Sequence, residues 1–239
     1  MGESDSLNGC RNDLLLMPWI SQCNIALGGH IGNAETIAFS FRNASEHALS
    51  IGLHPSYPDR KYFGRSRQNM TISEIVSALR KQIDEALEVA ENEAVTISHI
   101  KFHGQLYNDL EISSNLRDSI LTLVCDYPDL ALMGHSGGQL MMAAVKRDIE
   151  FIREAFADRA YIAASRLQPR SEDGALITDP ELAAEQALSI ALKQKLTLVA
   201  GNTVDLIADS LCVHADTPNS LQILRAIKHT LARHHIEIN

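Results

Sequence analysis

The sequence has 239 residues, of which 45% are hydrophobic and 21% charged, enough for one large α/β domain with a full core. The formal net charge is −9 and no lysine- or arginine-rich run occurs, which argues against nucleic acid or an anionic membrane as a partner. The four cysteines lack disulfide or zinc spacing, and no signal peptide or membrane-spanning run is visible. We therefore expect a cytoplasmic protein.

Strand-like and helix-like segments alternate along the first half of the chain. Residues 23–26 are predicted to form a short buried strand, followed by a glycine turn and a helix that Asn33 can cap. The next strand is residues 50–53. Thr71 and Glu74 form a capping box for a long helix with Ile75, Leu79, Ile83 and Leu87 on one face.

The alternation continues through the second half. It predicts strands over residues 97–102, 130–133, 149–155 and 211–213, and helices around residues 116–123, over 139–146, and from Asp179-Pro180 and Thr217-Pro218. Residues 161–176 are expected to be irregular. Six or more strands alternating with helices indicate a mostly parallel sheet, and an open doubly wound sheet and a closed barrel fit this pattern equally.

Five of the ten histidines lie at or just beyond the ends of predicted strands: His30, His54, His103, His135 and His214. Functional groups of α/β folds gather at the carboxyl ends of strands. Clustered imidazoles suit metal binding or proton transfer, although each one singly is more often a hydrogen-bonded loop residue. We predict that His30, His54, His103 and His214 converge, with Asp59 and Lys101 beside them.

Three motifs carry the other candidate residues. Two prolines stiffen the loop from His54 to Asp59, where the aspartate could instead cap a turn. Lys101 and His103 share one face of a strand, and a buried lysine needs an anionic partner. Arg159 and Arg170 could clamp a carboxylate or phosphoryl group, or Arg159 could form a loop ion pair with Asp158 or Glu154. The sequence contains neither common nucleotide-binding loop, so ATP, if used, is expected to be bound with or by a partner.

These motifs together resemble the LamB/YcsF family over nearly the whole chain. The matching segments are Cys23-Asn24-Ile25-Ala26 with Gly29-His30, His54-Pro55-Ser56-Tyr57-Pro58-Asp59 with Phe63-Gly64-Arg65, Lys101 with His103-Gly104 and Leu106-Tyr107-Asn108, Phe156-Ala157-Asp158-Arg159 with Tyr161, Pro169-Arg170-Ser171 with Gly174-Ala175-Leu176-Ile177, and Val213-His214 with Asp216. Two positions differ from the family pattern. Members usually carry a first strand ending in Asn-Cys-Asp before the match to Gly2-Glu3, and the family's His-Ala-Gly-Asp is His30-Ile31-Gly32-Asn33 here.

The resemblance implies a single domain over residues 1–239, a seven-stranded (β/α) barrel like that of glycoside hydrolases and polysaccharide deacetylases. It also implies that the chain is one of the subunits of an ATP-dependent 5-oxoprolinase. This enzyme converts 5-oxo-L-proline to L-glutamate with ATP cleavage, and the chain would act in it together with B and C subunits. We assign catalytic roles to five residues, His54, Asp59, Lys101, His103 and Asp158. Lactam binding is assigned to seven, Asn24, His30, Tyr57, Tyr107, Arg159, Arg170 and His214.

Two alternatives stay open at this stage, a non-catalytic lactam-binding or regulatory barrel and a metal-dependent carbohydrate deacetylase. The family's carboxylates are missing at two positions, so we expect no firmly bound metal. If a divalent ion binds, Glu3, His30 and His54 are its expected ligands.

Overall fold

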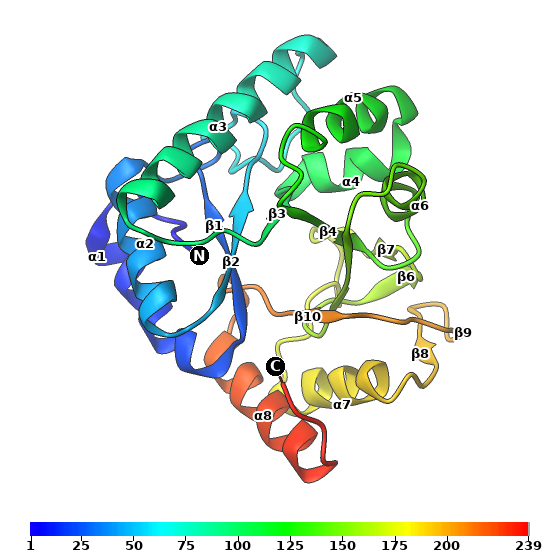
Figure 1. Cartoon of the computed structure of the whole chain (residues 1–239). Helices are drawn as coiled ribbons and strands as arrows, with labels where there is room; N and C mark the ends of the chain where they lie inside the picture. Colours follow the sequence, from blue (N-terminus) through cyan, green and yellow to red (C-terminus); the bar gives the residue numbers. More distant parts are fainter. Residues whose placement is uncertain (239) are drawn as a thin grey trace. The chain divides into compact units, whose positions relative to one another are not determined.

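The computed structural model describes residues 1–238, and the chain divides into two compact units (Figure 1). The first comprises Met1–Gly134 with Met142–Phe151, and the second comprises His135–Met141 with the residues from Ile152 onward. Both units contain parallel strands and helices, so the α/β class predicted from the sequence is confirmed. None of the helices within residues 1–238 has the length and apolar character that crossing a membrane requires.

In the first unit, parallel strands lie side by side in the order β1 (Gln22–Ala26), β2 (Ser50–His54), β3 (His99–Lys101) and β4 (Ala131–His135). The longer helices of this unit are α2 (Ala34–Glu46), α3 (Ile72–Asn92), α4 (Gly104–Ile112) and α5 (Ser114–Val124). Three short helices precede β1, namely α1 (Leu7–Cys10), η1 (Arg11–Leu15) and η2 (Met17–Trp19). Helix α6 (Gln139–Val145) includes residues of both units.

The predicted starts of the first two long helices are confirmed. The Asn33 side chain accepts hydrogen bonds from the Glu35 and Thr36 amides at the start of α2. Thr71 and Glu74 form the expected capping box at the start of α3. The predicted apolar faces are buried, with Ile37 and Phe41 in α2 and a row of side chains in α3 that comprises Ile75, Leu79 and Ile83.

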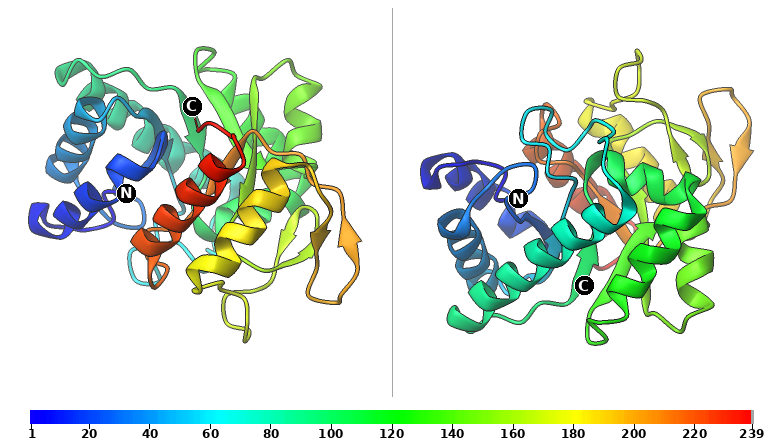
Figure 2. Two further views of the ribbon diagram at one scale, coloured as in Figure 1. Left: turned by 90° about the horizontal axis from the view of Figure 1, so that it is seen from below. Right: turned by 90° about the horizontal axis from the view of Figure 1, so that it is seen from above.

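The second unit combines one parallel strand pair with two small hairpins. Strands β5 (Phe151–Phe156) and β10 (Ser210–Cys212) pair in parallel, whereas β6 (Tyr161–Ala163) with β7 (Arg166–Leu167) and β8 (Leu196–Thr197) with β9 (Thr203–Val204) are antiparallel. Helices α7 (Pro180–Ala191) and α8 (Ser220–Arg233) lie side by side (Figure 2). Alanines of α7 pack against isoleucine and leucine side chains of α8 to form the core of this unit.

Some elements differ from the sequence prediction. The helix expected from Thr217-Pro218 begins at Ser220, with Asn219 in a left-handed conformation at its N-cap. The segment 161–176, predicted to be irregular, contains the β6–β7 hairpin. Helix α4, which begins at Gly104, was not predicted as a separate helix. The seven-stranded closed barrel remains a prediction.

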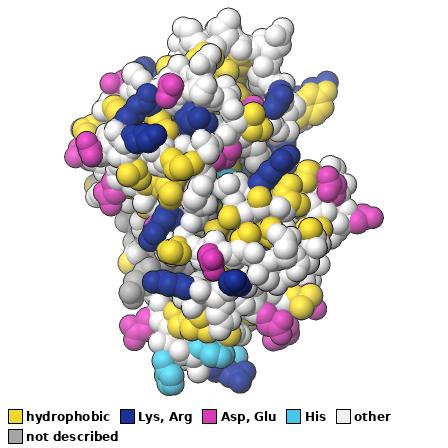
Figure 3. Space-filling view, turned by 90° about the vertical axis from the view of Figure 1, so that its right-hand side faces the viewer, with side chains coloured by type: hydrophobic (Ala, Val, Ile, Leu, Met, Phe, Trp, Pro, Cys, Tyr) yellow, Lys and Arg dark blue, Asp and Glu magenta, His cyan; other side chains and the backbone are white. Residues whose placement is uncertain are grey.

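The molecular surface shows no concentration of basic side chains on the face drawn in Figure 3. Lysine and arginine side chains are scattered there among acidic and hydrophobic ones.

A buried hydrogen bond that passes over β2 connects β1 to β3. His99 Nε2 lies 2.9 Å from Asn24 Oδ1, and His99 is fully buried. The imidazole crosses β2 at Gly52, where an added Cβ would lie 2.2 Å from His99 Nε2. Glycine is therefore required at position 52 because of space rather than backbone conformation.

The Gly52→Ala substitution should destabilise the protein by about 1–3 kcal/mol, because the new methyl group forces a buried ring to move. The free energy of unfolding, measured in urea, tests this. On a His99→Ala background the same substitution should cost much less, since the ring is gone. An equal cost on both backgrounds would contradict the steric explanation.

Candidate active site

Three of the predicted histidines come together in the first unit. His30 follows β1, His54 ends β2 and His103 follows β3 as the N-cap of α4. The His30 and His103 rings are stacked, with centroids 3.7 Å apart, and the His54 and His103 rings meet edge to face at 4.9 Å. All three side chains are at least nine-tenths buried. Their convergence was predicted from their positions at strand ends.

The hydrogen bonds of His54 and His103 determine which ring nitrogens carry protons. His54 Nδ1 lies 2.7 Å from the Lys101 carbonyl oxygen, and His103 Nε2 lies 2.9 Å from the Phe63 carbonyl oxygen. A carbonyl oxygen only accepts, so both of these nitrogens must be donors. In the neutral rings the remaining nitrogens, His54 Nε2 and His103 Nδ1, therefore hold lone pairs, and they face each other at 3.1 Å.

A serine orients the third imidazole. The Ser56 hydroxyl donates to the Tyr57 carbonyl oxygen at 2.9 Å, so it accepts from His30 Nδ1, also at 2.9 Å. Ser56 is itself fixed by Gln82 of α3, whose side chain bonds both the Ser56 amide and its carbonyl. In the neutral ring His30 Nε2 is therefore unprotonated, and this buried atom has no hydrogen-bond partner.

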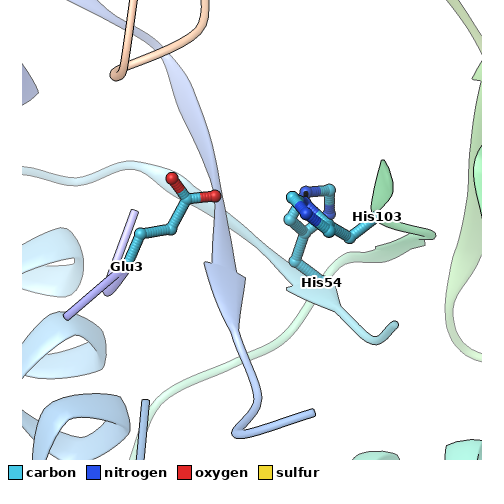
Figure 4. A group of neighbouring side chains, drawn as sticks. All are labelled: Glu3, His54 and His103. Atoms are coloured by element: carbon cyan, nitrogen blue, oxygen red, sulfur yellow. Dashed lines mark hydrogen bonds between the residues drawn. The ribbon is translucent and has the colours of Figure 1, made fainter. Parts of the chain in front are cut away.

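Glu3 places a carboxylate beside these rings, directed toward His54 and His103 (Figure 4). One carboxylate oxygen lies 3.8 Å from His30 Nε2. Burial opposes ionisation of Glu3, but its contact with His30 and the charge of the N-terminal ammonium outweigh burial and hold the Glu3 pKa well below its ordinary value. Burial lowers the pKa of His54 and His30, and it lowers that of His103 to about 3. At neutral pH the cluster thus contains neutral imidazoles and one carboxylate.

The loop around Phe63 lies against the histidines. The Phe63 ring meets His30 edge-on, with centroids 5.0 Å apart, and its backbone φ is +56°. The loop is joined to α4 because the Gln105 amide donates to the Gly64 carbonyl oxygen. Gly104 has φ +61°, and a Cβ there would lie 2.4 Å from that same oxygen. Glycine at position 104 therefore permits the close approach that sets the His103 hydrogen bond.

Lys101 and Tyr107 lie together within the same unit. Lys101 is 6% exposed, and its ammonium lies 5.8 Å from the centre of the Tyr107 ring. The Lys101 carbonyl is also the acceptor for His54. The Lys101 carbonyl thus orients His54, and the side chain of the same residue is buried.

Three other predicted residues of this unit form hydrogen bonds within the protein, namely Asp59, Tyr57 and Asn24. The Asp59 carboxylate accepts hydrogen bonds from the Tyr62 amide and the Ser66 hydroxyl, as in the capped-turn alternative. Tyr57 donates its hydroxyl to Asp109, and Asn24 bonds His99. The structure shows these side chains engaged in hydrogen bonds within the protein.

In the second unit, Asp158 and His214 form a hydrogen-bonded pair. His214 Nδ1 lies 3.0 Å from the fully buried Asp158 carboxylate, which also accepts from the His214 amide and, at 2.6 Å, from the Thr217 hydroxyl. Burial opposes ionisation, yet His214 and Thr217 lower the pKa of Asp158 to about 2. An ionised aspartate on Nδ1 leaves His214 Nε2 as the base of an acid/base pair.

The two arginines predicted to bind substrate contact the protein in this unit. Arg159 donates to the carbonyl oxygens of Gln168 and Ala175, and Arg170 forms an ion pair with Asp216 at 3.0 Å. Through these two bonds Arg159 joins the two sides of the loop between β7 and α7.

Sequence reasoning missed several residues that position the site. Ser56, Gln82 and Phe63 fix the orientation of the histidines, and Thr217 was assigned to a helix start. Ser56 and Phe63 lie within the motifs quoted above, but no pattern showed their hydrogen bonds. Among the described residues, Glu3, His54 and His103 are the group that offers ligand atoms within 4.8 Å of one another.

The chain is similar in sequence and in structure to known proteins. It is 33% identical over 236 residues to a protein of Haemophilus influenzae (strain PittEE) that is named as the A subunit of 5-oxoprolinase, covering 98% of this chain and 96% of that protein. It also resembles the crystal structure of a lactam utilization protein from Thermus thermophilus, with a TM-score of 0.90, 31% identity, and coverage of 100% of this chain and 96% of that one.

A more distant structure shares the fold alone. It is a putative cellobiose-phosphate cleavage protein from Enterococcus faecalis V583, with a TM-score of 0.59, 10% identity, and coverage of 99% of this chain and 93% of that one. The sequence model of the LamB/YcsF family matches residues 1–239. With a match over the whole length, the chain belongs to the LamB/YcsF family.

Proposed function

We propose that this chain is the A subunit of an ATP-dependent 5-oxoprolinase that works with B and C subunits. In this function 5-oxo-L-proline is opened to L-glutamate while ATP is cleaved to ADP and phosphate. The observation that carries the proposal is the 33% identity over 98% of the chain to a protein named as the A subunit of 5-oxoprolinase. The likeness to a lactam utilization protein supports the same class of substrate.

The chemistry of the lactam explains why ATP would be coupled to its opening. A five-membered lactam is an unstrained, resonance-stabilised amide, so its carbonyl carbon is a poor electrophile. Transfer of a phosphoryl group to the lactam oxygen would make that carbon reactive toward water. The chain lacks both common nucleotide-binding loops, so we assign ATP binding to the complex with the partner subunits.

The histidine cluster supplies groups suited to such a reaction. Neutral imidazoles with unprotonated nitrogens can accept a proton from water, and a lysine ammonium can stabilise negative charge on oxygen. His103 and Lys101 are the residues to which we assign these two roles. The Asp158–His214 pair in the second unit is a further candidate for proton transfer, with Asp158 as the positioning residue.

The isolated chain should form no glutamate from 5-oxoproline, with or without ATP, because an unactivated lactam demands strong carbonyl polarisation. Addition of purified B and C subunits should produce glutamate in proportion to ATP hydrolysis. Both products are measured in the same reactions. Glutamate formation by the chain alone would refute the division of labour proposed here, and lactam binding without turnover by the full complex would favour a regulatory role.

Within the full complex, His103→Ala and Lys101→Ala should each lower the rate of glutamate formation by about a hundredfold or more. Removal of a positioned acid/base or oxyanion-stabilising group commonly has an effect of this size. Initial rates at saturating ATP provide the measurement, and circular dichroism tests that the variants are folded.

Matched controls are available in exposed parts of the same unit. His47 ends α2, and Lys81 lies on the exposed side of α3 in an ion pair with Glu85. His47→Ala and Lys81→Ala should retain the wild-type rate. Unchanged rates in both His103→Ala and Lys101→Ala complexes would remove these residues from the mechanism.

A further inference from the structure

We propose that the first unit contains a binding site for a divalent transition-metal ion. The ligands are His54 Nε2, His103 Nδ1 and a carboxylate oxygen of Glu3. With an ion bound, His103 would act on water as a ligand of the ion and not as a free base. These three groups come from the segment before β1, the end of β2 and the N-cap of α4, and their ligand atoms lie within 4.8 Å of one another. Figure 4 shows the carboxylate directed toward the two rings.

Without an ion, the site contains an unfavourable contact between two ring nitrogens. The proton-bearing nitrogen of His54 donates to the Lys101 carbonyl oxygen, and that of His103 donates to the Phe63 carbonyl oxygen. The other two nitrogens therefore direct lone pairs at each other across 3.1 Å. Two acceptors at this distance repel unless a positive species lies beside both of them, and a metal ion held between them removes the repulsion.

The spacing of the two ring nitrogens also fits a shared metal ion. A Zn²⁺ ion binds histidine nitrogen at about 2.0–2.1 Å, so two imidazoles on one tetrahedral ion have their nitrogens about 3.3 Å apart. The observed separation of 3.1 Å is close to that value. Metal-bound histidines also commonly donate their second nitrogen to a backbone carbonyl, which fixes the ring, and both rings do so here.

An independent observation comes from His30. Its Nε2 is unprotonated and buried, has no hydrogen-bond partner, and lies 3.8 Å from the Glu3 carboxylate. A buried acceptor without a partner is costly, and a water molecule on the metal ion could donate to it. Two histidines and one carboxylate leave coordination positions open, the pattern of a catalytic rather than a structural site.

The structure also removes a reason for expecting weak metal binding. Asn33 occupies a position where the family carries aspartate, and the sequence suggested that a ligand had been lost. The Asn33 side chain caps α2 by accepting from the Glu35 and Thr36 amides. Position 33 thus has a capping role that asparagine fulfils, and the carboxylate of the proposed site comes from Glu3.

Cobalt binding to the isolated chain tests this inference and does not depend on 5-oxoprolinase activity, so failure of the proposed function would leave the result interpretable. The chain is stripped with a chelator and titrated with Co²⁺ while visible absorption is recorded. We expect one ion per chain, with bands of a four- or five-coordinate site, and displacement of the ion by Zn²⁺.

Adventitious binding is controlled by substitution. The adjacent exposed His234 and His235 are replaced by glutamine in every protein tested, and His47→Gln provides a matched control that should bind normally. Glu3→Gln, His54→Gln and His103→Gln should each weaken Co²⁺ binding by at least about a hundredfold, since even outer-shell changes cost up to that much.

Two outcomes would overturn the proposal. One is the absence of Co²⁺ bands, together with ¹⁵N chemical shifts that show a proton shared by His54 and His103. The other is binding that survives all three ligand substitutions. If a histidine variant does not fold, Glu3→Gln still decides the question, because the Glu3 side chain is 22% exposed and is the least buried of the three ligands.

Discussion

A backbone carbonyl oxygen can accept a hydrogen bond but cannot donate one, and the histidine cluster of the first unit is organised by this restriction. The carbonyls of Lys101 and Phe63 hold the protons of His54 and His103 on the outer side of the pair. Ser56 does the same for His30 through a hydroxyl that is already committed to a carbonyl. The unprotonated nitrogens are thus directed by main-chain geometry, which side-chain motion cannot easily alter, so the site is preorganised.

The sequence predicted the positions of the cluster but not its hydrogen bonds. His30, His54 and His103 could be placed together because parallel strands bring their carboxyl ends to one edge. Their tautomers depend on acceptors such as Phe63, which is 40 residues away from His103 and lies in a loop without periodicity. Asp59 shows the opposite case, since its short-range contacts with Tyr62 and Ser66 fit the capped turn that the local sequence allowed.

In the second unit, a threonine expected to cap a helix donates a hydrogen bond to a buried carboxylate. Thr217-Pro218 has the form of a helix start, and a threonine at an N-cap is ordinarily favourable. The Asp158 carboxylate is fully buried and needs several donors, and Thr217 is one of them. Helix α8 begins at Ser220, after Asn219 in a left-handed conformation, and the Thr217 hydroxyl serves the carboxylate. Sequence patterns report local preferences, whereas the demand of a buried carboxylate arises only once the chain is folded.

The hydrogen bond from His99 to Asn24 over Gly52 has a consequence for how this fold can change over evolution. The three residues lie on three neighbouring strands, and each is suitable only while the other two are present. A side chain at position 52 excludes the ring at position 99, and loss of that ring leaves the amide at position 24 without its partner. Homologous chains should therefore either keep all three or exchange them as a set, so that these positions covary.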